Sequence, residues 1–324
     1  MTHQIIKLKF KTAVHFGDGS LNDAEFALPA HTVFSALCHE ALLLEGEAGI
    51  QRLVDAVNQG TLRISDALPF IGDTYYIPKP ALHVEPKIDE ADQNVKKTFK
   101  KLKYIPIDKF ACFCRGGFVG KDAREITEKF KLGERGSRVL VASVKRESAD
   151  NKVGGDPYSV GIFQFRNNAG LYVLAKGEES ELENLMELFK ALSYSGIGGK
   201  RSSGLGGFEV EFAEPDHFAK LLDCSKSNRV MSLSACMANK DELAGMVTNG
   251  KQQYYILKRA GGFIASATYG NTPKRKRDFY DFAAGCVFAK PFKGGVSNVS
   301  TCEMGGGAHP VYHYHAPMWI GVNL

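Results

Sequence analysis

Apolar and charged residues alternate at the start of the chain. Apolar side chains stand at positions 6, 8 and 10 and lysines at 7, 9 and 11, which is the two-residue period of a half-buried strand with a basic outer face. Between residues 32 and 44 the apolar positions recur every three or four residues. This spacing predicts a helix that packs on the first strand.

Strand and helix patterns continue to about residue 212. They predict strands near 61–64, 75–77, 138–144, 160–165, 171–174 and 208–212, and a helix at 180–192. From about 84 to 120 the periodicity weakens, and the stretch KKTFKKLK at 96–103 holds five lysines, which indicates an insertion. The order of elements predicts an α+β fold with a decorated ferredoxin-like unit, βαββαβ.

A second set of elements follows the EPDHF stretch at 214–218. Strands are predicted near 230–236, 253–258, 285–289 and 318–322, and a helix near 240–248. We therefore expect two domains: residues 1–213 as an N-terminal ferredoxin-like domain, and residues 214–324 as a smaller α+β domain. The two halves show no sequence repeat.

Composition narrows the class of protein only slightly. With 44% hydrophobic and 24% charged residues among 324, the chain has an ordinary globular composition. Its net charge of +5 permits polyanion binding without requiring it. The seven cysteines include no CxxC pair, and the N-terminus has no apolar signal-like segment. We therefore expect a cytoplasmic protein without a membrane span.

A glycine-rich loop follows the predicted helix at 180–192, in the stretch SGIGGKRSSGLGGFEVEF at 195–212. It is not a P-loop, because Tyr194 stands where the first glycine is needed and Arg201 follows Lys200. A GxGxxG fingerprint would need a glycine at 201. The loop also leaves a helix C-terminus, whose partial negative charge repels phosphate.

An anion in this loop would have to be held by side-chain cations, hydroxyls and backbone N–H groups, while glycines would allow close approach. The alternative is a glycine helix cap followed by a flexible turn. The candidate contact residues are Gly196, Gly198, Gly199, Lys200, Arg201, Ser202, Ser203, Gly204 and Gly206.

Two residues near the N-terminus are further candidates. His15 lies in a predicted loop and is either a hydrogen-bonding or RNA-contact residue or, with an acid partner, the general base of an RNA-cleaving site. No acid partner is visible in the sequence. Phe16 would either stack on a base or fill the core.

Cationic stretches supply other candidate contacts. The lysines of 96–103 and the run Lys274-Arg275-Lys276-Arg277 could hold phosphates or form solvated faces. Aromatic residues follow the second run, which favours RNA or partner contact there. Arg138, Arg146 and Tyr158 flank the turn predicted at 154–157 and would either line an RNA path or lie on a strand surface.

A zinc site is the least supported option. Cys112-x-Cys114 has no second cysteine pair, and His309, His313 and His315 lie in a stretch that reads as an extended tail. We therefore expect neither a metal nor a cofactor.

The arrangement of helix, GxGGKRSSGxG loop and strand resembles the RAMP proteins of CRISPR–Cas systems. Seven blocks in order narrow the resemblance to the fourth Csm subunit of type III-A interference complexes. These blocks are HFGDGSL (15–21), FSALCHEAL (34–42), SDALPF (65–70), PKP (78–80), SGIGGKRSSGLGGFEV (195–210), KRDFYDFAAG (276–285) and HPVYHYHAPMWIGV (309–322).

This resemblance implies two ferredoxin-like domains and a non-catalytic, antiviral role in capping the 5′ repeat-derived handle of the CRISPR RNA (crRNA). It implies contacts with the large Palm-domain subunit and with the repeated backbone subunit. It also implies a thumb-like projection, at about 84–120 here, that meets the guide–target RNA duplex. The family carries an acidic residue before its first helix, where this chain has His31.

Three hypotheses therefore remain after the sequence. The first is an RNA-binding subunit in which 196–206 cradles the handle, while His15, Phe16 and the basic insertion line its path. The second is a metal-independent endoribonuclease that processes CRISPR repeats with His15. The third is a scaffold that bridges protein subunits without contacting RNA.

Overall fold

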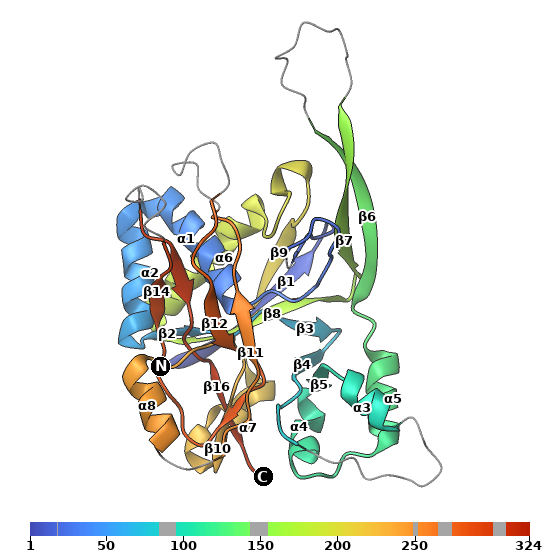
Figure 1. Ribbon diagram of the computed structural model, residues 1–324, viewed down its shortest axis with the longest axis vertical. Coiled ribbons are helices and arrows are strands. Elements are labelled where there is room, and N and C mark those ends of the chain that lie inside the picture. Colours follow the sequence, from blue (N-terminus) through green and yellow to red (C-terminus); the bar gives the residue numbers. More distant parts are fainter. Residues whose placement is uncertain (18, 84–94, 143–154, 249–251, 265–273, 301–308) are drawn as a thin grey trace, which may run out of the picture.

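The fold was determined as a computed structural model, shown in Figure 1. The structure describes residues 1–17, 19–83, 95–142, 155–248, 252–264, 274–300 and 309–324. Statements below on what is present or absent concern these residues.

The N-terminal part is built on an antiparallel seven-stranded sheet, in which spatial neighbours are often distant in sequence. Its strands run in the order β5-β4-β3-β8-β1-β9, with β2 also paired to β8. Residues Thr2–Leu8 of β1 pair antiparallel with Leu171–Gly177 of β8. The strands are β1 (Thr2–Phe10), β2 (Leu62–Ile64), β3 (Leu68–Ile71), β4 (Thr74–Pro78), β5 (Tyr104–Pro106), β8 (Ala169–Gly177) and β9 (Phe208–Ala213).

Three helices pack against this sheet: α1 (Ala30–Glu45), α2 (Glu47–Gln59) and α6 (Glu179–Ser195). Phe34 of α1 and Leu185 of α6 are buried in one core with Leu8 of β1. The helices predicted at 32–44 and 180–192 are therefore confirmed, whereas α2 was not predicted from the sequence.

The first strand is confirmed, but both of its faces are covered. Ile5, on the face opposite Leu8, is fully buried. The lysines predicted to form a basic outer face meet carboxylates of the neighbouring strand: Lys9 pairs with Glu211, and Lys11 Nζ lies 2.8 Å from Glu209. Most of the charge at this edge is therefore neutralised within the sheet.

The insertion, as far as the structure describes it, is a small helical layer rather than an extended projection. It contains α3 (Val95–Lys101), α4 (Ile107–Cys114) and α5 (Gly120–Lys129), so it continues past residue 120. Phe99, Phe113 and Phe118 pack together in its interior, with ring centroids 5.4–6.2 Å apart. Residues 84–94 lie outside the described residues. The projection expected at 84–120 is thus not seen in its described part.

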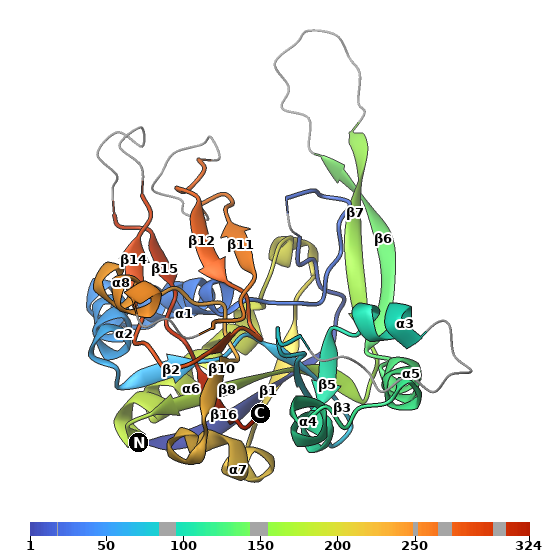
Figure 2. The same cartoon turned by 60° about the horizontal axis from the view of Figure 1, so that its bottom comes forward.

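The element that does project is a long hairpin of β6 (Gly133–Ala142) and β7 (Asp156–Phe165), which stands out from the body in Figures 1 and 2. Its strands pair in register from Gly133↔Phe165 to Ala142↔Asp156. The strand predicted at 160–165 falls in this hairpin, as does the one predicted at 138–144 up to residue 142; residues 143 and 144 lie outside the described residues. The turn predicted at 154–157 is misplaced, because β7 already begins at Asp156.

The C-terminal part contains three small antiparallel sheets with orders β13-β10-β16, β11-β12 and β14-β15. A second ferredoxin-like unit would have a helix before its last strand. Within the described residues, the chain between β13 and β16 instead forms strands β14 and β15. The elements are α7 (Ala219–Leu222), β10 (Arg229–Ser232), α8 (Lys240–Thr248), β11 (Leu257–Ala260), β12 (Phe279–Phe282), β13 (Val287–Phe288), β14 (Val296–Asn298), β15 (Tyr312–Tyr314) and β16 (Trp319–Val322), with 3₁₀ turns at Asp216–Phe218 and Cys224–Lys226.

The two parts share their hydrophobic cores. Tyr314 of β15 is fully buried against Phe34 of α1, with ring centroids 5.3 Å apart. Its hydroxyl accepts from the Ile64 N–H at 2.9 Å and donates to the Ile64 carbonyl at 3.1 Å. On the other sheet face, Ile5 lies in one cluster with Ile320 of β16. No described helix combines the length and apolar character needed to cross a bilayer.

Candidate nucleic-acid interface

The glycine-rich loop connects α6 to β9, as the sequence predicted. Gly196 ends α6 with φ of 74°, and its N–H donates to the Leu192 carbonyl at 2.8 Å. Gly198, Gly204 and Gly206 also have positive φ, a region that glycine enters without steric cost. Residues Arg201–Ser203 form one 3₁₀ turn at the tip. The glycine helix cap considered for this loop is therefore present, but it accounts for Gly196 alone.

The loop packs directly on the segment that contains His15 and Phe16. The Gly199 N–H donates to the His15 carbonyl at 3.0 Å, and the Gly206 N–H donates to the Ala13 carbonyl at 2.9 Å. A Cβ at Gly198 would lie 2.7 Å from the Phe16 ring. Close packing inside the protein thus explains several glycines for which the sequence suggested contact with phosphate.

Gly204 is different. Its φ is 80°, yet a Cβ there would meet no atom within 4 Å. It lies at the exposed end of the loop, directly after Ser202 and Ser203. At this part of the loop the space around the backbone is open, although the Gly204 N–H itself donates to the Arg201 carbonyl at 2.9 Å.

The structure decides between the two roles that the sequence left open for Phe16. Its side chain is buried, and its ring packs edge-on against Phe10 at a centroid distance of 5.8 Å. It also lies against Gly198. A ring in this position is part of the hydrophobic core and cannot stack on a base, so the proposed base-stacking role is wrong.

His15 is also held by the protein. Its Nδ1 donates to the Gly161 carbonyl of β7 at 2.8 Å, because a carbonyl can only accept. The side chain is largely buried. This contact fixes the ring between the glycine loop and the base of the hairpin and leaves Nε2 as the nitrogen available to a ligand.

Lys200 joins the loop to the β6–β7 hairpin. Its Nζ lies 3.0 Å from the Tyr158 hydroxyl and 4.7 Å from the centre of the Tyr158 ring. Arg138 of β6 donates to the Ser203 carbonyl at 3.3 Å. The fold therefore brings together Lys200, Tyr158 and Arg138, which were singled out separately in the sequence.

The backbone of Lys200 is unusual. With φ of 59°, Lys200 is the sole non-glycine residue with positive φ in the described part of the chain. This conformation costs an L-residue about 1–2 kcal/mol. Backbone strain of this kind concentrates at functional positions, which singles out Lys200 within the loop.

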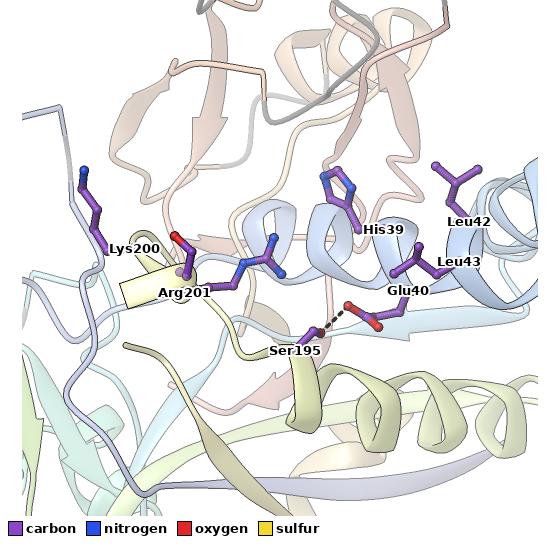
Figure 3. A pocket seen from close by; sticks show the side chains of 9 residues that line it. His39, Glu40, Leu42, Leu43, Ser195, Lys200 and Arg201 are labelled. Carbon is purple, nitrogen blue, oxygen red and sulfur yellow. Dashed lines mark hydrogen bonds between the residues drawn. The ribbon is translucent and has the colours of Figure 1, made fainter. Parts of the chain in front are cut away.

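A hollow of about 750 Å³ lies between α1 and the loop. In Figure 3 the Arg201 guanidinium extends toward α1, whereas Lys200 points away from that helix. The hollow is lined by His39, Glu40, Leu42, Leu43, Ser195, Gly198, Lys200, Arg201 and Ser202.

The wall formed by α1 carries groups of both signs. Glu40 is buried and accepts a hydrogen bond from the Ser195 hydroxyl (Figure 3). Burial lowers the pKa of His39, and the nearby Arg201 lowers it further, so His39 is neutral at pH 7. Neither residue was proposed from the sequence, although both lie in the FSALCHEAL block. The positive charge that faces α1 therefore comes from Arg201, whereas Lys200, which also lines the hollow, directs its ammonium to Tyr158.

The second basic run lies on another element. Lys274 and Arg275 precede β12, and Arg275 lies over the Phe263 ring at 5.2 Å. Lys276 is partly buried, and burial lowers its pKa while Asp281 raises it. In Figures 1 and 2 the loop at 201–203 lies between the β11–β12 hairpin and the β6–β7 hairpin. The glycine-rich loop and the second basic run thus lie on the same side of the molecule.

The remaining candidate residues do not lie together in the zinc site that was considered from the sequence. Arg146 lies outside the described residues. Cys112 is exposed on α4, while Cys114 on the same helix is buried and burial raises its pKa to about 12. His313 is buried beside Asp281 on β12, not beside the cysteines. The cysteines and the C-terminal histidines are thus on separate elements.

The sheet, the helix–loop–strand arrangement and the basic glycine loop define a class of protein. Residues 7–209 match the sequence profile of the RAMP superfamily, and the chain belongs to that superfamily. Residues 225–322 match the profile described as the CRISPR Csm4 C-terminal domain.

Sequence relatives narrow the assignment. A "CRISPR system Cms protein Csm4" of Mycobacterium tuberculosis (strain ATCC 25618 / H37Rv) is 38% identical over 309 residues, covering 95% of this chain and 94% of the relative. One of Streptococcus thermophilus is 30% identical over the full length of both chains. The chain is a member of the Csm4 family.

Solved structures show the same fold. The chain matches a component of the "Csm3-Csm4 subcomplex in the type III-A CRISPR-Cas interference complex" with a TM-score of 0.65 and 19% identity, over the full length of both chains. It matches a component of the "Csm1-Csm4 cassette in complex with pppApA" with a TM-score of 0.61 and 21% identity, covering 99% and 98% of the two chains.

Proposed function

We propose that this chain is a non-catalytic, RNA-binding subunit of a type III-A CRISPR Csm complex that caps the 5′ handle of the crRNA. Membership of the Csm4 family supports a place in such a complex. The observation that carries the RNA-binding role is the contact of the glycine loop with the β6–β7 hairpin, through Lys200, Tyr158 and Arg138.

This arrangement fits single-stranded RNA better than a small nucleotide. Single strands bind where cations follow the backbone and aromatic rings offer a face to unstacked bases. Lys200, Arg201 and Arg138 supply three cations around one loop, and the exposed Gly204 has no side chain that would keep a phosphate away. Tyr158 presents a ring that Lys200 already contacts. Lys274 and Arg275 would extend the path beyond this centre.

We also propose that the N-terminal sheet is a ferredoxin-like unit. The order β3-β8-β1-β9, with α1 after the first strand and α6 before the last, supports this assignment. The two family profiles end at residue 209 and begin at residue 225, which supports a boundary near residue 214. The C-terminal part would then be a divergent ferredoxin-like domain with strands in place of one helix.

The proposed partners are the large Palm-domain subunit and the repeated backbone subunit of the complex. Solved structures of Csm3–Csm4 and Csm1–Csm4 assemblies support both contacts by analogy of fold. We assign the contact with the guide–target duplex to the β6–β7 hairpin, because it is the described element that stands out from the body (Figure 2).

A binding and cleavage assay tests the proposal. Purified protein is incubated in EDTA with end-labelled crRNA that carries its 5′ handle, and with a handle-scrambled RNA, and both are resolved on one gel. We expect preferential binding of the handle RNA without cleavage. Equal binding of both RNAs would contradict handle capping, and no binding to either would favour a protein scaffold.

Charge-removal variants locate the interface. Lys200→Ala with Arg201→Ala should weaken binding, and should reduce the slope of log affinity against log salt by about 1.4, because each lost phosphate contact contributes about 0.7. The matched control is Lys220→Ala with Lys226→Ala, two exposed cations on α7 and the turn after it. Equal affinity and slope in both double variants would remove the loop from the interface.

The alternative of a repeat-cleaving endoribonuclease has less support. General acid–base cleavage needs a second titratable group near the base, and the hydrogen bond found for the His15 ring goes to a backbone carbonyl. Specific cleavage within the repeat in EDTA, abolished by His15→Gln, would nevertheless establish this activity.

A further inference from the structure

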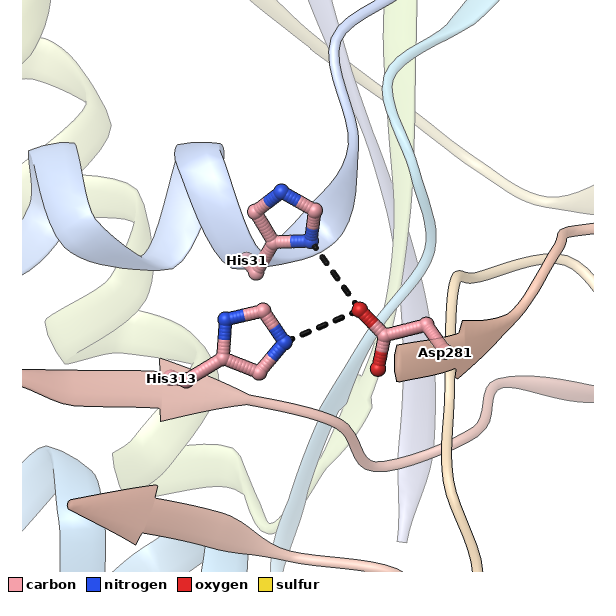
Figure 4. Close-up of side chains that lie close together, drawn as sticks. All are labelled: His31, Asp281 and His313. Carbon is pink, nitrogen blue, oxygen red and sulfur yellow. Dashed lines mark hydrogen bonds and ion pairs between the residues drawn. The ribbon is translucent and has the colours of Figure 1, made fainter. Parts of the chain in front are cut away.

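Three side chains with metal-binding atoms meet at the junction of α1 with the C-terminal hairpins. His31 lies in the first turn of α1, Asp281 on β12 and His313 on β15 (Figure 4). His313 Nε2 lies 2.9 Å from Asp281 Oδ2, and His31 Nδ1 lies 3.7 Å from the same oxygen. One potential ligand atom from each residue falls within 4.8 Å of the others.

The cluster is buried and its polar atoms are incompletely satisfied. Asp281 and His313 are each about 1% exposed. Of the five buried side-chain polar atoms without a hydrogen-bond partner in the described residues, three belong to this cluster: His31 Nδ1, Asp281 Oδ1 and His313 Nδ1. Unsatisfied buried polar atoms are rare, and an unseen ion is one of their ordinary explanations. An ion held between the three residues would satisfy His31 Nδ1, which faces Asp281 Oδ2.

We propose that His31, Asp281 and His313 bind a divalent transition metal, with Zn²⁺ as the ion that best suits the donors. Two imidazoles and a carboxylate are common zinc ligands, and zinc takes four ligands in a tetrahedron at about 2.0–2.2 Å from nitrogen and oxygen. Neighbouring ligand atoms in such a tetrahedron lie about 3.3 Å apart. The two measured separations, 2.9 and 3.7 Å, lie on either side of that value.

The surroundings indicate how the coordination would be completed. A water can take the fourth position from the side of His31, whose side chain is 14% exposed. His315 is not available, because its Nδ1 donates to the Met237 carbonyl at 2.9 Å and its Nε2 accepts from the Ser297 hydroxyl at 2.8 Å. The charge of Lys276 acts on Asp281 electrostatically and would oppose a bound cation.

The proposed role is structural. The ligands come from segments centred at residues 31, 281 and 313, so a bound ion would cross-link the N-terminal helix to two C-terminal strands. A structural metal contributes its binding free energy to folding. The site would therefore hold the C-terminal hairpins against α1, on the side of the molecule where the basic loop lies.

Metal content and melting temperature of the full chain test the proposal. We expect about one zinc per chain by mass spectrometry, in keeping with a single site. Zn²⁺ at 100 times its dissociation constant should raise the melting temperature by about 5 °C, while Mg²⁺ should not. Co²⁺ substitution should give the visible absorption of a tetrahedral site.

Matched histidine variants decide whether these residues are the ligands. His31→Gln and His313→Gln should lose the zinc and the zinc-dependent shift, whereas the exposed His217→Gln should keep both. His31→Gln remains informative if His313→Gln fails to fold, because His31 is at the rim of the cluster. Wild-type protein without zinc, zinc retained in His31→Gln, or zinc lost on Cys112→Ser would each overturn the proposal; the first outcome would leave an ordinary buried ion pair.

Discussion

At the scale of single residues, the glycines of the 196–206 loop have different structural roles. Gly198 faces the Phe16 ring, whereas Gly204 faces open space, although both have positive φ. Sequence alone cannot separate these roles, because both residues appear as glycine in one loop.

Replacing these two glycines by alanine should therefore have unequal effects. Gly198→Ala should lower the free energy of unfolding by about 2–5 kcal/mol, since it adds a clash to an unfavourable φ. Gly204→Ala should lower it by about 1–2 kcal/mol, from φ alone. Urea unfolding measures both, and equal losses would contradict the packing of Gly198 on Phe16.

Asp66 is a second residue whose role only the fold reveals. Its Oδ1 accepts from the N–H of Ala30 at the start of α1 at 2.8 Å and from the N–H of Ala235 at 2.9 Å. Burial raises the pKa of Asp66 to about 6, against an ordinary value of 3.8, even though these hydrogen bonds lower it. One carboxylate thus joins the first helix to the C-terminal part.

This shift predicts a pH dependence. Below pH 3.8 the carboxyl is protonated in both the folded and the unfolded chain, and between pH 3.8 and 6 the folded chain alone keeps the proton. Stability from this group therefore falls as pH rises through that window, by up to about 3 kcal/mol.

Unfolding at pH 4 and pH 7 checks this prediction. In wild type the free energy of unfolding should fall between pH 4 and pH 7 through this group, and Asp66→Asn should lack that fall because its side chain does not titrate. Asp73→Asn, in an exposed turn, should leave the wild-type difference in place. An unchanged difference in Asp66→Asn would contradict the raised pKa.

At the scale of elements, the helical layer α3–α5 has an aromatic interior. Phe113→Ala should lower stability by about 3–5 kcal/mol, since it removes a fully buried ring. Hydrogen exchange should accelerate in α4 and α5 more than in α6, and handle-RNA affinity should change little. Tyr194→Ala, whose side chain is 93% exposed, is the control. A large loss of RNA affinity in Phe113→Ala would place this layer in the interface.

The elements that the sequence predicted are those with long, regular patterns. The helix at 240–248 agrees with α8 residue for residue, and the strand at 208–212 agrees with β9 to within one residue. Strands β3, β12, β14 and β15 were missed; each holds only three or four residues, a length at which a period was read in β2 and β16 but not in these four. The helices of the insertion were missed because lysines interrupt their apolar positions.

The candidate site was predicted in part for a similar reason. Lys200 and Arg201 stand out in the sequence, and Tyr158 was noted as an aromatic near cations. The contact of Lys200 with Tyr158 depends on how the loop packs against β7, through His15 and Gly161. Such long-range packing has no local sequence signal. His39 and Glu40 were missed for the same reason, because the packing of α1 brings them to the loop.

At the scale of the whole molecule, the two parts are joined through their cores. Tyr314→Phe removes the hydroxyl that satisfies both backbone groups of Ile64. It should lower the free energy of unfolding by about 1–3 kcal/mol, because the Ile64 N–H is left unpaired, while unfolding remains a single transition. Calorimetry tests both points, with Tyr280→Phe, which is 56% exposed, as the control. Two separate transitions in wild type would mean that the parts unfold independently.

The left-handed backbone conformation of Lys200 bears on how selection acts at this position. A lysine in left-handed backbone opposes folding, and glycine or asparagine would relieve that cost. If its charge serves RNA, selection for binding and selection for stability act in opposite directions at this position. Engineering that ranks substitutions by stability alone would then replace this lysine, and would produce a sturdier protein that has lost part of its function.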